Sequence, residues 1–202
     1  MKMLYVTDRA AIGNTAFAKT LDALAGAPNL LVQLREKNAP DREVFERARA
    51  AREKLGPDVL FVNGRFDVAL AAEAAGVHLP ADGLPLPRIR SHTPRGFRVG
   101  VSTHAPDEAR EAIAAGADLV VIGPIFDTPS KRAYGEPLGV RALEALPRLE
   151  EHSAAVFAIG GIDEARLSDL EPYTDRVSGI AAVRLFQEAG DPRAVAERIA
   201  ER

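Results

Sequence analysis

The segment Leu30-Leu31-Val32-Gln33-Leu34-Arg35-Glu36-Lys37, residues 30–37, is the stretch from which the fold can be worked out. It begins as a short apolar run, typical of a buried strand, and then becomes polar and charged. Alternation along a strand would place Gln33, Arg35 and Lys37 on one side of it. An amide and two cations would then leave a buried core together, which favours an anionic partner because burying unpaired charge is costly. The alternative is that the strand has simply reached solvent.

A helical pattern follows this run directly, and the same unit recurs along the chain. Residues Asp41 to Lys54 predict a helix after Pro40, with acids in its first turn and bases near its end. Pro106 opens another helix in the same way. Most of the strand-like runs are apolar throughout, as expected for a parallel sheet that is covered on both faces. The eight runs are Leu4–Thr7, Leu30–Gln33, Val59–Val62, Gly76–Leu79, Arg98–Val101, Leu119–Ile122, Ala155–Ile159 and Gly179–Ala182.

Eight strand–helix units in 202 residues predict an α/β fold, a (β/α)8 TIM barrel formed by a single domain over residues 1–202. An open doubly wound sheet usually has fewer strands and a glycine-rich loop after the first one, where this chain has Asp8-Arg9. The stretch from Arg65 to Ala75 leaves room for one compact helix. The proline-rich stretch from Leu84 to Gly96 predicts a short or distorted helix.

Composition excludes several classes of function. The absence of cysteine removes thiol nucleophiles, cysteine-based metal sites and disulfides. A net charge of -3 gives no sign of a nucleic-acid partner. No apolar run approaches the length of a membrane span, and the N-terminal residues are too few for a signal-peptide core. We therefore expect a cytoplasmic protein with neither nucleic acid nor membrane as partner, and the sequence is compatible with a homo-oligomer.

In a barrel, chemistry belongs at the C-terminal ends of the strands, and the loops after strands seven and eight are the usual phosphate site. Gly160-Gly161 follow the seventh run and Ala182-Val183-Arg184 end the eighth. Glycines allow backbone N–H groups to approach an anion closely, and Arg184 would add a side-chain contact. These residues predict a site for a small phosphorylated ligand. A tight turn at the glycines and a solvated Arg184 are the alternatives.

The other strand ends supply candidates for binding the rest of such a ligand. A loop from Gly123 to Lys131 is expected to be mobile and to cover the site, with a plain surface loop as the alternative. Its hydroxyl and ammonium groups would reach anionic oxygens. The predicted substrate-binding residues are Gln33, Arg35, Lys37, Asn63, Ser102, Thr128 and Ser130, and Lys131 is a candidate for catalysis.

Two of the four histidines, His78 and His104, fall at strand ends and are candidates for proton transfer. His104 is the stronger candidate because Ser102-Thr103-His104 begins a loop. For each, a structural hydrogen bond is the alternative. His92 and His152 are expected to be surface residues.

Seven motifs occur in one order over nearly the whole chain. They are Leu4–Asp8, Val32–Lys37, Val62–Ala69, Gly76–Leu79, Ser102–His104, Gly123–Phe126 with Lys131, and Ala158–Ile162. Together they resemble the thiamine phosphate synthase and TenI family. The resemblance implies a (β/α)8 barrel that handles the thiazole phosphate moiety on the route to thiamine.

The resemblance has two branches. A thiamine phosphate synthase joins an aminopyrimidine diphosphate to the thiazole phosphate, with magnesium neutralising the leaving diphosphate. The residues that match its diphosphate and pyrimidine side are Gln33, Arg35, Lys37, Asn63, Ser102 and Lys131. The metal ligands do not match. Gly64 stands where the synthase has Asp, and Pro80-Ala81-Asp82-Gly83 carries its acid one place early. A shifted Asp82, or Asp67 in its place, is the remaining route to a metal.

Our leading hypothesis from the sequence is therefore the TenI branch, a thiazole tautomerase that acts on a carboxythiazole phosphate by proton transfer without metal or other cofactor. His104, His78 or Lys131 would move the proton, because Pro124 stands where some TenI proteins have a histidine. A divergent, magnesium-dependent thiamine phosphate synthase is the first alternative. A non-catalytic regulatory protein that binds thiazole phosphate is the second.

Overall fold

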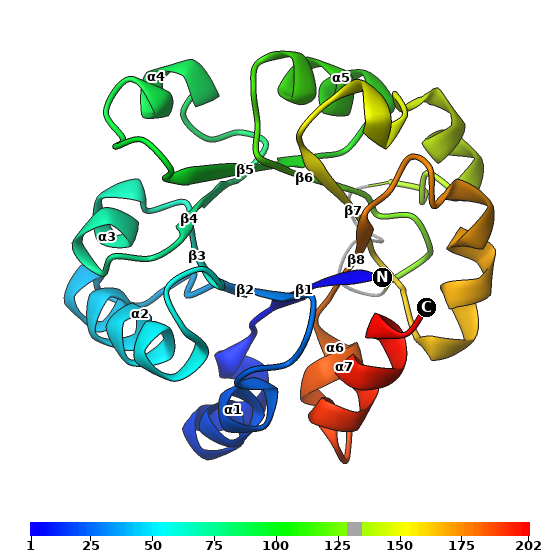
Figure 1. The fold of residues 1–202 in the computed structure, drawn as a ribbon. Coiled ribbons are helices and arrows are strands. Elements are labelled where there is room, and N and C mark those ends of the chain that lie inside the picture. Colours follow the sequence, from blue (N-terminus) through cyan, green and yellow to red (C-terminus); the bar gives the residue numbers. More distant parts are fainter. Residues whose placement is uncertain (129–134) are drawn as a thin grey trace.

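The computed structural model describes residues 1–128 and 135–202 and confirms the (β/α)8 TIM barrel (Figure 1). Eight parallel strands close into a barrel in the order of the sequence, and β1 pairs with both β2 and β8. The strands are β1 (Lys2–Val6), β2 (Leu30–Leu34), β3 (Leu60–Asn63), β4 (Gly76–Leu79), β5 (Arg98–Thr103), β6 (Leu119–Ile122), β7 (Ala155–Ile159) and β8 (Gly179–Ala182).

Helices surround the barrel on its outside (Figure 1). The helices predicted at Asp41, between Arg65 and Ala75, between Leu84 and Gly96, and at Pro106 are confirmed as α2 to α5. The α-helices are α1 (Arg9–Leu24), α2 (Asp41–Leu55), α3 (Phe66–Ala71), α4 (Leu86–Arg90), α5 (Pro106–Ala114), α6 (Arg184–Gln187) and α7 (Pro192–Ala200).

The connections on either side of β7 depart from the expected alternation with α-helices. They form the 3-10 helices η2 (Val140–Ala145), η3 (Leu149–Glu151) and η4 (Glu164–Tyr173). Pro147 separates η2 from η3, and Pro172 lies inside η4. Proline cannot donate the backbone hydrogen bond that an α-helix needs at such a position, which favours short, tight turns here.

The core has two layers. The larger lies between the strands and the helices, where helix faces such as Val44, Ala48 and Ala51 of α2 are buried. The smaller fills the barrel itself and consists of Leu4, Val6, Phe61, Leu119, Val121, Phe157 and Ala181. In the described part of the chain, no helix has both the length and the apolar character needed to cross a membrane.

Polar side chains continue the inner layer toward the C-terminal ends of the strands. Phe61 of β3 lies in the barrel interior, so Asn63, two residues further along, faces the same way. Gln33 follows Leu31 of the inner cluster in the same manner. Neighbouring pairs are in register, with Asn63 opposite His78. The fold thus gathers amide and imidazole groups above an apolar plug.

Candidate functional site

Four of the predicted site residues are brought together in two hydrogen-bonded pairs on neighbouring strands. The Gln33 side-chain amide on β2 donates to the Asn63 amide oxygen on β3 at 2.8 Å. On the next two strands, His78 Nε2 lies 2.8 Å from Ser102 Oγ. Gln33 and His78 are buried, whereas Asn63 and Ser102 are half-buried. The buried member of each pair therefore fixes the orientation of the more accessible one.

The environment of His78 makes it neutral. The residue is 1% exposed, and burial lowers the pKa of His78 to about 4. Nδ1 is buried and has no hydrogen-bond partner among the described residues. A Cβ on Gly100 of β5 would stand only 2.8 Å from Nδ1, so glycine makes room for the ring. His78 thus holds the Ser102 hydroxyl through a hydrogen bond from within the barrel. Its predicted part in proton transfer stays a proposal.

The two cations after β2 leave from a loop, because the strand ends at Leu34. Arg35 and Lys37 therefore lie beyond the strand, and their position on one side of it stays a prediction. The backbone N–H of Arg35 donates to Thr7 Oγ1 at 3.0 Å, which ties the loop to the end of β1. Among the described residues, neither the Arg35 nor the Lys37 side chain forms an ion pair. Both remain available to an anion.

The described half of the loop after β6, residues 123–128, is held against the end of β7. Ile125 N–H donates to the Ile159 carbonyl at 2.8 Å, and Phe126 N–H donates to the Gly160 carbonyl at 3.0 Å. Two backbone hydrogen bonds therefore join this half of the loop to the end of β7, and the movement of the loop stays a prediction. Thr128 is buried at its end. Ser130 and Lys131 lie outside the described residues.

This pairing accounts for the two glycines after β7. Gly160 and Gly161 have φ values of 102° and 64°, which glycine adopts without strain. A Cβ on Gly161 would stand 2.5 Å from the Asp127 carbonyl oxygen, and one on Gly160 would stand 2.6 Å from Pro124 Cα. Tight packing thus requires both glycines, whether or not they also bind an anion.

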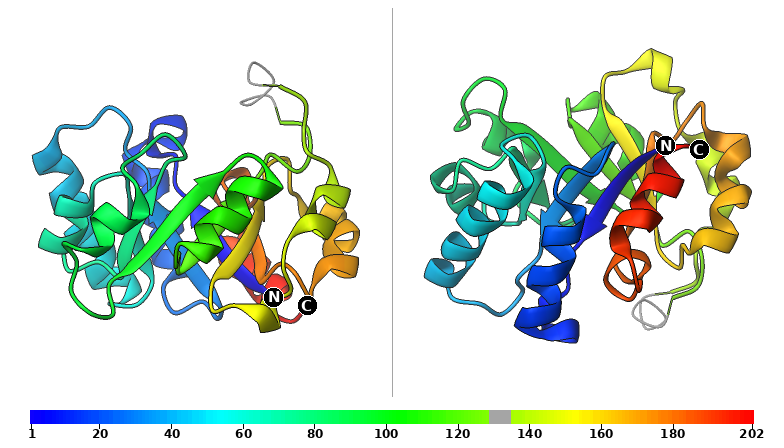
Figure 2. Two further views of the ribbon diagram at one scale, coloured as in Figure 1. Left: turned by 90° about the horizontal axis from the view of Figure 1, so that it is seen from above. Right: turned by 60° about the horizontal axis from the view of Figure 1, so that its bottom comes forward.

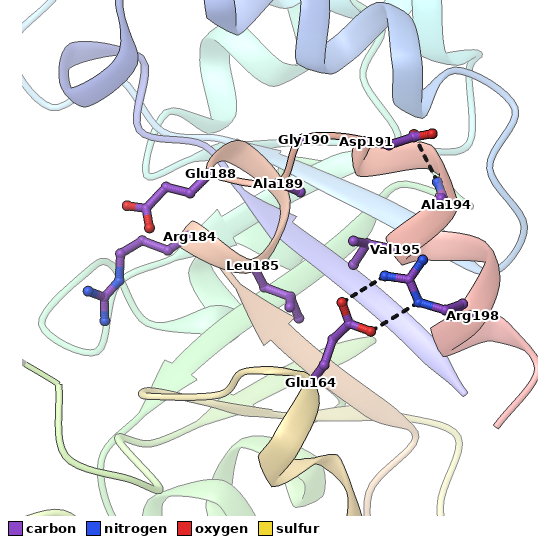
Figure 3. Close-up of a pocket in the computed structure, with 10 residues that line it drawn as sticks. All are labelled: Glu164, Arg184, Leu185, Glu188, Ala189, Gly190, Asp191, Ala194, Val195 and Arg198. Atoms are coloured by element: carbon purple, nitrogen blue, oxygen red, sulfur yellow. Dashed lines mark hydrogen bonds and ion pairs between the residues drawn. The ribbon is translucent and has the colours of Figure 1, made fainter.

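The end of β8 lies beside this turn. Ile159 of β7 pairs with Ala181 of β8, so Gly160 comes next to Ala182. Val183 and Arg184 follow, and Arg184 is the first residue of α6. Arg184, Glu164 and Arg198 line a pocket of about 350 Å³. Figure 3 shows the ion pair between Glu164 and Arg198 on one side of this pocket, and Arg184 on the other side, extending away from the pair. The predicted phosphate residues therefore come from adjacent strand ends.

His104 lies in a different environment from the buried His78. It is exposed and follows the last residue of β5. Its Nδ1 lies 2.8 Å from the Gly123 carbonyl oxygen, so Nδ1 carries the proton and donates it. In the neutral ring Nε2 is then the acceptor. This arrangement suits a base at the rim of the barrel.

Of the two remaining histidines, only His92 lies on the surface. His92 is exposed, as expected. The prediction for His152 is wrong, because it is half-buried and both ring nitrogens are covered without a hydrogen-bond partner among the described residues. A position just before a strand does not reveal whether neighbouring turns cover the side chain.

The donor set at the ends of β3 and β4 does not fit a magnesium ion. Gly64 offers no side-chain ligand, and Asp82 is exposed. Asp67 is engaged by Arg65, whose Nη2 lies 2.7 Å from Asp67 Oδ2 and which lowers the pKa of that carboxyl. No cluster of three or more potential metal-ligating side chains occurs among the described residues. Magnesium is usually held by one or two carboxylates together with water and substrate phosphates, and neither Gly64 nor the Arg65-paired Asp67 offers a free carboxylate at this rim.

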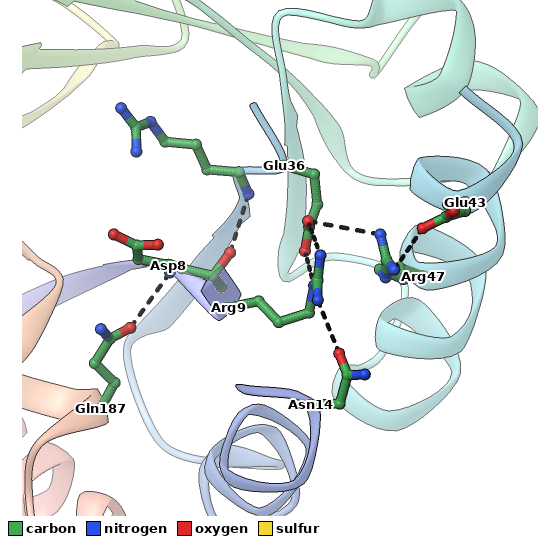
Figure 4. A network of polar contacts seen from close by, with 9 residues as sticks. Asp8, Arg9, Asn14, Glu36, Glu43, Arg47 and Gln187 are labelled. Atoms are coloured by element: carbon green, nitrogen blue, oxygen red, sulfur yellow. Dashed lines mark hydrogen bonds and ion pairs between the residues drawn. The ribbon is translucent and has the colours of Figure 1, made fainter. Parts of the chain in front are cut away.

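Sequence reasoning missed a polar network behind the β2 loop (Figure 4). Glu36 lies between Arg9 and Arg47, and Asp8 N–H donates to Gln187 Oε1 at 3.3 Å. The sequence shows an acid, Glu36, between two basic residues, but the arginines that pair with it are not these neighbours and lie elsewhere in the chain. Only the fold brings α1 and α2 to it.

The fold and the rim together define a (β/α)8 barrel with a polar and cationic mouth. A family model described as thiamine monophosphate synthase matches residues 3–186. A putative thiamine-phosphate synthase of Geobacter sulfurreducens is 42% identical over 192 residues, which cover 93% of this chain and 87% of that protein. The chain belongs to the thiamine phosphate synthase and TenI family.

Two further similarities extend over nearly the full length. A thiamine-phosphate synthase of Methanoculleus marisnigri is 37% identical over 202 residues, covering 98% of this chain and 94% of the relative. The solved structure of thiamine phosphate pyrophosphorylase from Pyrococcus furiosus has a TM-score of 0.81 at 28% identity and covers 99% of this chain and 94% of that one.

Proposed function

We propose that this protein is a thiamine-phosphate synthase, which couples an aminopyrimidine diphosphate to a thiazole phosphate and releases diphosphate. One observation carries the proposal: two cations follow β2 and a glycine turn follows β7, and these would be two separate places for an anion at the barrel mouth. The first is formed by Arg35 and Lys37 after β2, and the second by the glycine turn after β7 beside the end of β8. A reaction with two anionic substrates fits that arrangement, and the names of the full-length relatives support it. This reverses the order in which the sequence alone ranked the two enzymes.

Each candidate then has a role in the coupling. The hydrogen-bonded pairs would bind the pyrimidine ring, because amide and hydroxyl groups match ring nitrogen and amino groups. Thr128, Ser130 and Lys131, from the sequence after β6, are the candidates for contacts with the departing diphosphate. The pyrimidine side comprises Gln33, Asn63 and Ser102, and the thiazole phosphate side comprises Gly160, Gly161, Ala182, Val183 and Arg184.

Charge on the leaving diphosphate is the main chemical demand. The residues after β3 and β4 do not fit the magnesium that the resemblance implies. Cations held where negative charge develops stabilise the transition state, as a magnesium ion would. Charge-assisted hydrogen bonds to phosphate oxygens are also strong. Arg35 and Lys37 would supply them.

The test is product formation from both substrates. We would incubate the protein with aminopyrimidine diphosphate and thiazole phosphate, with excess magnesium and separately with EDTA, and measure released diphosphate and thiamine phosphate. The proposal expects product only when both substrates are present. No product at saturating substrates and magnesium would rule the synthase out.

A variant at the β3 end tests the mismatch with magnesium. Gly64 has a φ of 70°, a conformation that Asp tolerates better than most residues, and its nearest neighbour beyond the adjacent residues is Pro80 Cδ at 3.9 Å. Gly64→Asp should therefore increase the rate gained when magnesium replaces EDTA. The matched control Gly96→Asp has a similar φ of 84° and should leave that gain as in the wild type.

A second candidate, the thiazole tautomerase, is favoured by one observation at His104. The Gly123 carbonyl fixes Nδ1 as the donor and leaves Nε2 as a base at the rim. The test is aromatisation of the carboxythiazole phosphate tautomer, followed by absorbance in the presence of EDTA. His104→Ala should slow it by roughly 100-fold or more while thiazole phosphate still binds. Tight thiazole phosphate binding with neither reaction would instead support the regulatory binding protein.

A further inference from the structure

Glu36 stands between the two cations of the proposed diphosphate site, yet it contacts neither of them. Its side chain is 5% exposed. Arg9 of α1 donates to it through two nitrogens, with Nε 2.9 Å from Oε1 and Nη2 3.0 Å from Oε2. Arg47 of α2 adds a looser contact, with Nη1 3.6 Å from Oε2. Figure 4 shows the carboxylate enclosed by these two arginines.

The two arginines are themselves held in place. Arg9 Nη1 donates to Asn14 Oδ1 at 2.8 Å, and Arg47 Nη2 donates to Glu43 at 2.7 Å. A two-pronged contact between a guanidinium and a carboxylate fixes orientation as well as distance. Glu36 is therefore tied to both neighbouring helices, α1 and α2.

A second anchor lies one residue earlier. The Arg35 N–H donates to Thr7 Oγ1 at 3.0 Å, and Thr7 N–H donates to the Gln33 carbonyl at 3.0 Å. The backbone at the start of the loop is thus fixed to β1, while the next side chain is fixed to α1 and α2. Between these anchors the loop has little freedom, although it is outside the strand.

We propose that Glu36 is a positioning residue, which holds the loop so that Arg35 and Lys37 present their charges to the diphosphate of the substrate. The inference rests on the proposed function, which assigns these two cations to that group. Arg9 and Arg47 also occupy the carboxylate, so that it does not pair with the cations beside it. A cation pair that is oriented before the ligand arrives binds it with a smaller loss of conformational freedom.

Glu36→Gln is the smallest replacement that removes the charge of this side chain. The Arg9 side chain is 21% exposed, and glutamine keeps the shape of Glu36 with one oxygen that still accepts a hydrogen bond from the arginines. Each also keeps a second partner, Asn14 or Glu43. Glu36→Gln therefore tests the orientation of the loop in a folded protein, and thermal unfolding checks that it is folded.

The experiment is titration calorimetry with two probes, inorganic pyrophosphate and thiazole phosphate. A carboxylate that acted only through its charge would repel pyrophosphate, and Glu36→Gln would then strengthen its binding. Positioning predicts the opposite sign: pyrophosphate binding should weaken about tenfold, because small misplacements of a clamping residue are costly. Thiazole phosphate, which is assigned to the other side of the mouth, should change less than about twofold.

Two variants frame the result. Arg9→Lys keeps the charge but loses the two-pronged contact, and it should weaken pyrophosphate binding in the same direction by a smaller factor. Glu46→Gln removes an exposed ion pair on the same helix α2 and should change neither probe. Unchanged or tighter pyrophosphate binding in Glu36→Gln, or an equal loss of thiazole phosphate, would overturn the positioning role alone. Wild-type protein that does not bind pyrophosphate would count against the proposed function as well.

Discussion

His78 and His104 show how far two identical side chains can diverge within one barrel. The first is enclosed by the strands and hydrogen bonded to Ser102, and the second is exposed beside the Gly123 carbonyl. Desolvation disfavours the charged form of a buried imidazole. The sequence placed both at strand ends, but His78 lies within β4 whereas His104 lies just beyond the end of β5, and the two positions differ in their access to water.

Burial of His78 predicts a dependence of stability on pH. The pKa of His78 falls from 6.5 to about 4 on folding, so the unfolded chain binds this proton more tightly than the folded chain does. The contribution of the neutral His78 to the free energy of unfolding is fully present above about pH 6.5 and is lost as the pH falls toward about 4. Between about pH 7.5 and about pH 4.5 the expected loss is roughly 2.5 kcal/mol.

Urea unfolding at those two pH values measures this loss. His78→Gln should remove it from the difference between the two free energies of unfolding, although the variant is less stable at neutral pH. His92→Gln, the same change at an exposed histidine, should keep the wild-type pH dependence. An unchanged pH dependence in His78→Gln would show that the imidazole is not held neutral.

At the scale of elements, the segment after β6 and the turn after β7 depend on each other. Two backbone hydrogen bonds join them, and the glycines lie where a Cβ would meet the opposite backbone. Any change that pushes the segment away also moves the backbone beside Ala182. The segment 123–128 and the turn at Gly160-Gly161 are therefore one packed unit.

Gly161→Ala tests this unit. Its φ of 64° and the 2.5 Å approach to the Asp127 carbonyl oxygen combine backbone strain with a clash. We expect a loss of about 2 kcal/mol in the free energy of unfolding and roughly tenfold weaker thiazole phosphate binding. Denaturant unfolding and calorimetry measure the two effects.

Gly96→Ala is the matched control, because it has a φ of 84° and no heavy atom within 4 Å of its Cβ. It should lose about 1 kcal/mol from backbone strain alone and bind thiazole phosphate normally. Equal binding losses in both variants would contradict the mechanical link between loop and turn.

At the scale of the whole molecule, the barrel depends on the meeting of the two ends of the chain. β1 and β8 pair directly, and α7 brings the C-terminus beside the N-terminus (Figure 2). The Met1 ammonium donates to the Ala200 carbonyl at 3.2 Å. Closure removes the open edges that a parallel sheet would otherwise expose.

Gly179 is the residue on which this closure depends most. A Cβ there would stand 1.8 Å from the Lys2 carbonyl oxygen, inside the β1–β8 pair. Gly179→Ala should therefore destabilise the barrel by about 3 kcal/mol, since a buried backbone contact cannot relax easily. Chemical denaturation measures it against Gly190→Ala, whose Cβ meets nothing within 4 Å. Equal stability of the two variants would mean that the strands can separate at this point without cost.

The sequence by itself determined the order of the eight strands, four of the helices and the family. These follow from local patterns, because an apolar run, a proline at a helix start and a motif order are visible without any contact across the fold. Gln33, Asn63 and Ser102 could be nominated in the same way, since strand ends in a barrel share one rim.

Only the tertiary structure decided the environments of those residues. It buried His78, tied Glu36 to Arg9 and Arg47, fixed residues 123–128 against β7 and covered His152. Each of these results depends on groups far apart in the chain that approach within a few ångströms. Burial and charge pairing are properties of such approaches, so no local pattern contains them. The sequence thus specified where the mouth of the barrel would be, and packing decided which of its groups are neutral, held or free.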